Sequence, residues 1–175
     1  MPESETRLSG QDADVLSGQV TVRAVREAGR EVDFVFSSNA LDSYGERVDQ
    51  SSWRLDRYNR SPVVLFAHKS RDLPIGKAKN VGVREGMLQG TVVIASEKAN
   101  PLAEQVWQSL KEGTLQAGSV GFIAHTLRWE KENDVEVLTL ADCELLEFSI
   151  CPIGACADAL ARMRSRAAAE RKPEP

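Results

Sequence analysis

The stretch LQAGSVGF, residues 115–122, decides the fold because a helix-like pattern changes there into an apolar strand. Its small polar residue, Ser119, lies between Gly118 and Gly121. Glycine permits tight backbone conformations and the close approach of other chain segments, so a serine here can present its hydroxyl from a rigid strand. A hydroxyl is a poor nucleophile at neutral pH and needs a base nearby. The chain contains only two histidines, which makes the search for that base short.

Outward from this stretch, the dominant pattern is that of β-strands. Residues 19–25 and 31–37 alternate with period two, and residues 28–30 between them suit a hairpin turn. Further segments of strand character are residues 62–67, 88–95, 119–129, 135–140 and 145–151. We therefore predict a mainly β domain with flanking helices (α+β), whose six or seven strands form a closed or nearly closed β-barrel.

Two helices are expected beside these strands. Asn100 and Pro101 supply a cap and a first helical residue, and Gly113 supplies a stop. The apolar residues between them recur at helical spacing. A second helix is predicted over residues 155–164, and a short helical turn near residues 51–55.

Length and composition favour one domain of moderate size in a chain of 175 residues. The net charge of −4 gives no electrostatic footprint for nucleic acid, and no apolar run reaches a membrane span of ~18 residues. No secretory signal is visible at the N-terminus.

We predict a flexible arm over residues 1–17, a folded domain over 18–163 and a flexible tail over 164–175.

His68 and Glu147 are the candidate partners of the serine. His68 ends an apolar strand, where it could transfer protons, or it could be a partly buried histidine that satisfies backbone groups. Glu147 interrupts the last apolar strand, so it either faces solvent or accepts the second imidazole proton of His68. Alternation places His125 about 20 Å along the strand from Ser119, too far for contact. Glu144, a rival carboxylate, is expected on the opposite strand face from Glu147.

No metal or cofactor is expected. The odd number of cysteines, Cys143, Cys151 and Cys156, argues against a disulfide framework and favours a reducing compartment. The three cysteines and the two histidines form no zinc-binding pattern. The favoured role of the cysteines is therefore that of small, buried hydrophobic residues. The acidic segment 42–49 falls short of a calcium loop and is interpreted as a turn.

Several motifs in order resemble the prohead (capsid maturation) proteases of tailed bacteriophages. These are the strand-end histidine in PVVLFAH, residues 62–68, then GSVGF, residues 118–122, after an amphipathic helix, and EFSICPIG, residues 147–154. Residues 42–48, 73–76 and 152–159 extend the resemblance, which covers roughly residues 30–160.

The resemblance implies a fold shared with herpesvirus assemblins, which are β-barrel serine proteases with a Ser-His-His triad. It places the nucleophile at Ser119, the general base at His68 and the third member at Glu147. Assemblins use arginines after the last strand to help build the oxyanion hole, and this chain has none there. The backbone N–H groups of Gly154, Ala155 and Cys156 are the substitute donors that we consider.

The implied function is that of a serine endopeptidase inside an assembling prohead, in the cytoplasm of a bacterial host. Its implied substrates are scaffold segments or the N-terminal extension of the major capsid protein, and the enzyme itself. The likeness to assemblins also implies a homodimer. Two alternatives stay open: a non-proteolytic assembly or scaffold factor that retains the protease fold, and a cysteine hydrolase that uses Cys151 or Cys156.

Overall fold

The computed structural model describes residues 4–7, 15–41, 45–133 and 135–152, with side chains from residue 22 onward. The strands in these ranges are β1 (Ser4–Arg7), β2 (Val15–Arg26), β3 (Glu31–Ser37), β4 (Glu46–Val48), β5 (Trp53–Arg54), β6 (Val63–Phe66), β7 (Gly76–Arg84), β8 (Met87–Ile94), β9 (Ala117–Glu132) and β10 (Val135–Cys151). The helices are α1 (Asp56–Arg60), α2 (Pro101–Glu112) and the 3₁₀ turn η1 (Gln50–Ser52).

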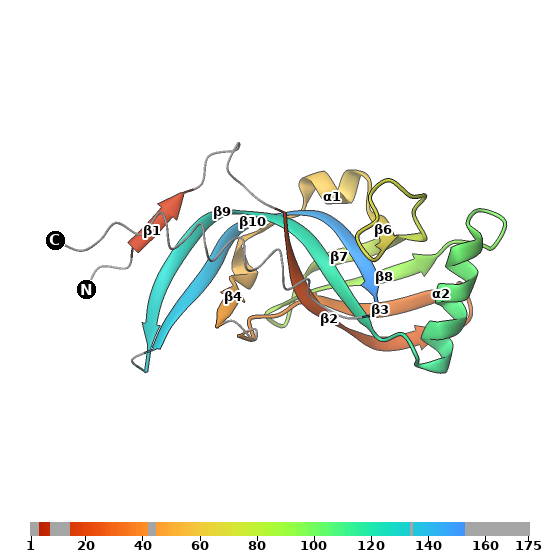
Figure 1. Ribbon diagram of the computed structural model, residues 1–175, viewed down its shortest axis with the longest axis horizontal. Helices are drawn as coiled ribbons and strands as arrows, with labels where there is room; N and C mark the ends of the chain where they lie inside the picture. The colour runs from red at the N-terminus through yellow and green to blue at the C-terminus, as the bar shows by residue number, and fades with distance from the viewer. Residues whose placement is uncertain (1–3, 8–14, 42–44, 134, 153–175) are drawn as a thin grey trace.

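The described strands form one strongly curled sheet, over which β9 and β10 arch (Figure 1). Seven strands make the curl in the order β9-β2-β3-β8-β7-β6-β10, and β10 also pairs with β9. Strand β6 is a weak junction, because its four residues share two register pairs with β7 and three with β10. The sheet is therefore a half-barrel that is open rather than closed.

The interior of the curl holds the hydrophobic core. Phe148 of β10 stacks on Phe36 with ring centroids 4.1 Å apart and lies 5.1 Å from the ring of Phe34. All three rings are buried, as are Leu145 and Phe122 on the paired strands β10 and β9. Burial of these side chains is the main force that holds the sheet in its curled form.

Helix α2 forms as the sequence predicts, and it lies across one end of the sheet (Figure 1). The Asn100 side chain accepts a hydrogen bond from the backbone N–H of Leu102, and Gly113 ends the helix with φ +74°. Four side chains of one face are buried: Ala103, Val106, Trp107 and Leu110. The Asn100 amide also donates to the carbonyl oxygens of Leu73 and Pro74, which fixes the loop after β6 to this helix.

The structure corrects several details of the predicted architecture. A closed barrel is wrong, because β6 is too short to join its neighbours along their length. The runs 135–140 and 145–151 are one strand, β10, and strand β7 and helix α1 were not foreseen. Parts of the predicted N-terminal arm, Ser4–Arg7 and residues 15–17, are in strands. The predicted helix 155–164 and the tail lie outside the described residues.

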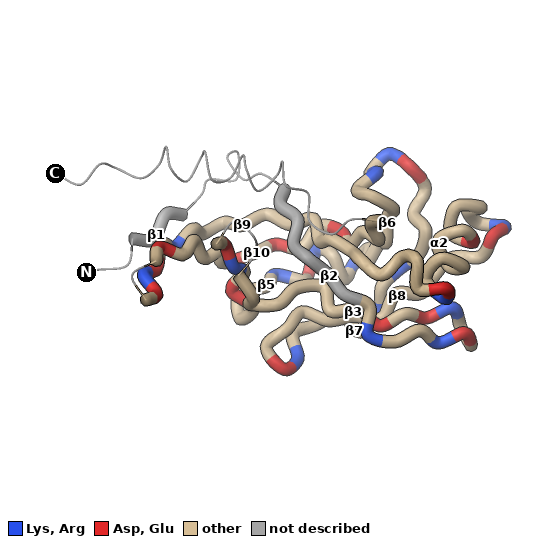
Figure 2. The backbone as a smooth tube through the Cα atoms, turned by 60° about the horizontal axis from the view of Figure 1, so that its bottom comes forward, with Lys and Arg blue, Asp and Glu red and all other residues tan. Residues whose placement is uncertain are grey.

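Charged residues of both signs are interspersed along the described backbone (Figure 2). Several form ion pairs, such as Arg26 with Glu31 and Asp33, and Arg30 with Glu104. Among the described residues, no helix has the length and apolar character that a membrane crossing requires.

Truncation of Phe148 tests the core. Phe148→Ala removes a ring that packs on Phe34 and Phe36, so we expect the free energy of unfolding to fall by about 3–5 kcal/mol. Urea denaturation followed by tryptophan fluorescence measures this change. The control is Val83→Ala at an exposed strand position, which should change stability by less than about 0.5 kcal/mol. Equal effects of the two substitutions would contradict the assigned core.

Candidate active site

His68 follows β6 at a sharp turn. The N–H of Lys69 donates to the carbonyl oxygen of Phe66, and the two central residues, Ala67 and His68, have φ of 51° and 59°. Positive φ is unfavourable for residues other than glycine, so the surrounding contacts must hold this turn. Two bonds to β10 do so: Ala67 N–H donates to the Ile150 carbonyl oxygen, and His68 N–H donates to Ser149 Oγ. The parallel pairing of β6 with β10 thus brings the histidine to β10.

Glu147 meets the imidazole of His68 directly. Nδ1 of His68 and Oε1 of Glu147 are 2.6 Å apart; the Glu147 side chain is largely buried, and that of His68 is partly buried. The register of β10 against β9 shifts between Leu145 and Glu147, so Leu145 pairs with Phe122 and Glu147 pairs with Gly121. This β-bulge places Leu145 on the core face and Glu147 on the other face, although simple alternation would put them together.

Ser119 shares the Glu147 face of the sheet. On β9 it pairs with Ser149, two residues along β10 from Glu147, and cross-strand partners point to the same side. Ser119 is fully buried, and its Oγ has no hydrogen-bond partner among the described residues. The same holds for His68 Nε2. Neither atom makes a hydrogen bond of ordinary geometry to a residue that the structure describes, although the Cys151 sulfur also interacts with the His68 ring. A serine–histidine pair would join these two atoms.

The environment of His68 favours the charged imidazolium. The sulfur of Cys151 beside the ring and the carboxylate of Glu147 raise the pKa of His68 to about 10, against the effect of burial, which lowers it. The imidazole of His68 is therefore mainly neutral, and able to accept a proton, only above a pH of about 10.

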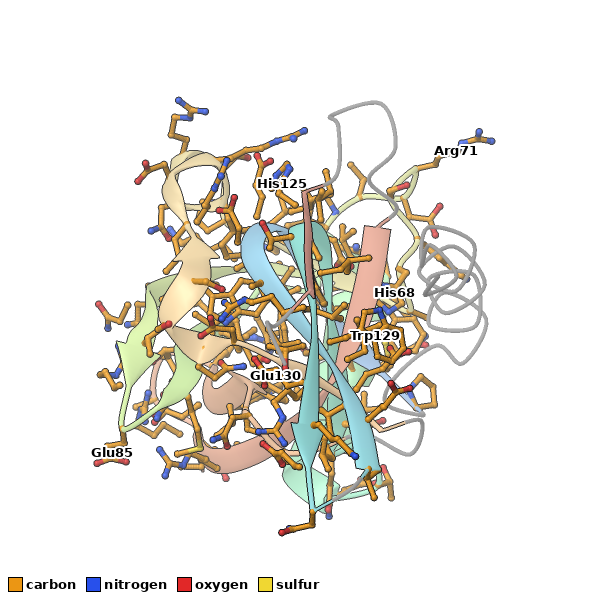
Figure 3. The ribbon with its side chains drawn as sticks, turned by 90° about the vertical axis from the view of Figure 1, so that its left-hand side faces the viewer. His68, Arg71, Glu85, His125, Trp129 and Glu130 are labelled. Atoms are coloured by element: carbon orange, nitrogen blue, oxygen red, sulfur yellow. The ribbon has the colours of Figure 1, made fainter. Side chains whose placement is uncertain are left out.

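His125 lies in another part of the molecule from His68 (Figure 3). Its Nε2 is 3.3 Å from Glu144 Oε2, and Glu144 also pairs with Arg57. The expectation that Glu144 lies on the opposite face from Glu147 is wrong, because the bulge places both on the same face: Glu144 pairs with Ile123 and Glu147 with Gly121. Glu144 differs from Glu147 in its partners, which are His125 and Arg57 rather than His68.

Two neighbours of His68 have no assigned place beside it in the sequence-based prediction. Ser149 carries a buried hydroxyl that contacts both His68 and Glu147. Cys151, for which the sequence favours a buried small hydrophobe and leaves a thiol nucleophile as the alternative, interacts with the His68 ring. Alternation from Glu147 predicts Ser149 on the Glu147 face, which the register confirms, and the same alternation extends to Cys151. The candidate oxyanion donors Gly154, Ala155 and Cys156 lie outside the described residues. In the part of the chain that is described, no group of three or more His, Cys, Asp or Glu side chains could hold a metal ion.

Comparison with protein families gives a match over residues 28–173 to the caudovirus prohead serine proteases. The chain belongs to this family. The match includes the histidine turn, the β9 serine and the β10 carboxylate. Searches of curated proteins and of solved structures gave no match.

Membership makes this chain a prohead protease of the serine class, with a role in capsid maturation. A serine peptidase of this kind acts on capsid protein within the assembling prohead. In this protease, the β-rich half-barrel carries the buried Ser119 and the His68–Glu147 pair.

Substitution of Glu147 tests the electrostatics of the pair. Glu147→Gln removes the negative charge beside His68 Nδ1, so we expect the pKa of His68 to fall below its wild-type value of about 10. Titration by NMR measures it, and His125→Gln assigns the signals of the two histidines. The control Glu144→Gln removes the carboxylate beside His125 and should leave His68 unchanged. An equal fall of the His68 pKa in both variants would refute the pairing.

Proposed function

We propose that this prohead protease is an endopeptidase in which Ser119 is the nucleophile, His68 the general base and Glu147 the group that orients the base. The observation that carries the proposal is the 2.6 Å contact between His68 Nδ1 and Glu147 Oε1, on the sheet face that also presents Ser119. A carboxylate that holds Nδ1–H fixes the tautomer whose Nε2 is free to accept a proton.

The proposed reaction begins when Ser119 Oγ attacks the scissile carbonyl carbon and His68 Nε2 takes the hydroxyl proton. Glu147 stabilises the resulting imidazolium. His68 then gives the proton to the leaving amine, and an acyl-enzyme remains on Ser119. Attack by water, with His68 again as base, releases the acid product and restores the serine. No metal or organic cofactor takes part in these steps.

Negative charge on the carbonyl oxygen requires hydrogen-bond donors. The backbone N–H groups of Gly154, Ala155 and Cys156 remain our candidates for this role. They come shortly after the end of β10 at Cys151 in the chain, and β10 carries Glu147.

The proposed substrates are scaffold segments or the N-terminal extension of the major capsid protein, and the protease itself. The family role in capsid maturation supports this choice. We further propose that the protein acts inside the prohead in the host cytoplasm as a homodimer, without nucleic acid or membrane as partner.

Removal of the nucleophile tests the proposal. With a precursor capsid protein that carries its N-terminal extension, Ser119→Ala should lower the cleavage rate by about 10⁶-fold, to below detection on a gel. Cys151→Ala, which removes the buried thiol on this face, should still cleave. Cleavage by the Ser119 variant together with inactivity of the Cys151 variant would favour a cysteine hydrolase. If folded wild-type protein leaves the capsid precursor intact yet promotes assembly, the assembly-factor alternative holds.

The pH dependence of cleavage follows from the pKa of His68. Only neutral imidazole accepts the serine proton, so kcat/KM should rise about tenfold per pH unit below the pKa and level off near pH 10. Glu147→Gln should move the inflection to lower pH and lower the plateau by about 10²–10⁴-fold. The measurement is the initial rate of peptide cleavage from pH 6 to about 11. A rate that is flat across this range would exclude His68 as the base.

A further inference from the structure

Ser149 occupies a central position in the site, yet no step of the proposed reaction uses it. It is fully buried on β10, and its hydroxyl has two partners. Its Oγ–H donates to Glu147 Oε2 at 2.7 Å, and its Oγ accepts the backbone N–H of His68 at 3.1 Å. One side chain therefore bridges the carboxylate and the backbone of the histidine.

The Glu147 carboxylate is divided between two partners. Oε1 meets His68 Nδ1 and Oε2 accepts from Ser149, so rotation of the group would break both bonds. Gly121 on β9 leaves room for this placement, because a Cβ at Gly121 would lie 2.5 Å from Glu147 Oε1 and 2.9 Å from its Cγ. The carboxylate is thus packed against bare backbone on one side and held by Ser149 on the other.

The backbone conformation of the His68 turn also requires stabilising contacts. His68 and Ala67 both have positive φ, which costs free energy outside glycine. The bond from His68 N–H to Ser149 Oγ is one of the two described bonds that tie the backbone of this turn to β10. Loss of the hydroxyl would free the histidine backbone and the carboxylate together.

The same contacts argue against Ser149 as the nucleophile. The Ser149 hydroxyl donates its hydrogen bond to Glu147 rather than to an imidazole nitrogen. Its oxygen accepts a hydrogen bond from the backbone N–H of His68. Ser119 Oγ, across the strand pair, has no such bonds among the described residues.

We propose that Ser149 is a positioning residue of this protease, whose hydroxyl fixes the Glu147 carboxylate and the His68 turn so that the imidazole is aimed for proton transfer. This inference rests on the proposed function of Ser119, His68 and Glu147.

A fluorophosphonate probe tests this without a protein substrate. It phosphonylates an activated serine: the serine oxygen bonds to phosphorus, fluoride leaves, and the serine proton passes to the base. Ser149→Ala should slow labelling of Ser119 by roughly tenfold to hundredfold, the effect of one hydrogen bond to a charged group. The matched control is Ser37→Ala, which removes another buried hydroxyl bonded to a side chain, that of Gln50, and should label at the wild-type rate.

A second readout separates positioning from a general structural effect. The His68 Nδ1 proton in its 2.6 Å bond should give a far-downfield ¹H NMR signal. Ser149→Ala should weaken or broaden this signal, while Ser37→Ala should leave it intact.

A second pair of variants, Ser149→Thr and Ser149→Val, introduces side chains of almost the same shape that differ by the hydroxyl. The Thr variant should label faster than the Val variant, which keeps the test decisive if the Ala variant does not fold.

The outcomes distinguish this inference from the proposed function. If wild-type protein is not labelled, or if Ser119→Ala is labelled equally well, the proposed function fails. If the adduct maps to Ser119 but Ser149→Ala labels at the wild-type rate, or Thr and Val label alike, only the positioning role fails. An adduct that mass spectrometry maps to Ser149 overturns the positioning role outright.

Discussion

One extra residue in β10, at a β-bulge, decides which face of the sheet the Glu147 carboxylate occupies. The bulge between Leu145 and Glu147 reverses the alternation, so Leu145 enters the core while Glu147 and Ser149 face the other side. Without the bulge, the carboxylate would point into an apolar interior, where a charge is costly unless it is paired. With it, the same strand supplies Phe148 to the core and a hydrogen-bonded carboxylate to the site.

The two glycines of β9 have separate uses, one on each face of the sheet. A Cβ at Gly118 would lie 2.8 Å from the Phe148 ring, and one at Gly121 would lie 2.5 Å from Glu147 Oε1. Each glycine makes room for a β10 side chain that a larger residue would displace. The two glycines thus let strand β10 pack closely against β9, the strand on which Ser119 is fully buried.

The histidine reaches this face from a distant part of the chain. Strand β6 pairs with β10 in parallel, then turns through two residues of positive φ, so that His68 meets Glu147 79 residues further along the chain. Contact with the Cys151 sulfur and the Glu147 carboxylate favours the imidazolium, whereas the proposed proton transfer from Ser119 needs the neutral ring. In the proposed mechanism, the pairing that orients His68 therefore also limits the fraction of neutral imidazole near neutral pH.

The sequence by itself determined the elements with strong local patterns: helix α2 through its Asn100 cap and Gly113 stop, and the alternating strand β3. Motif order also selected Ser119, His68 and Glu147 as one set. The sequence does not predict strand β7, because its largely polar, half-exposed residues show no sustained apolar alternation and the strand depends on its pairing with β8. The open half-barrel, the bulge and the contacts of Ser149 and Cys151 with the His68–Glu147 pair are decided only by the tertiary structure. Strand register and cross-strand contacts depend on residues far apart in the chain, and local periodicity carries no record of them.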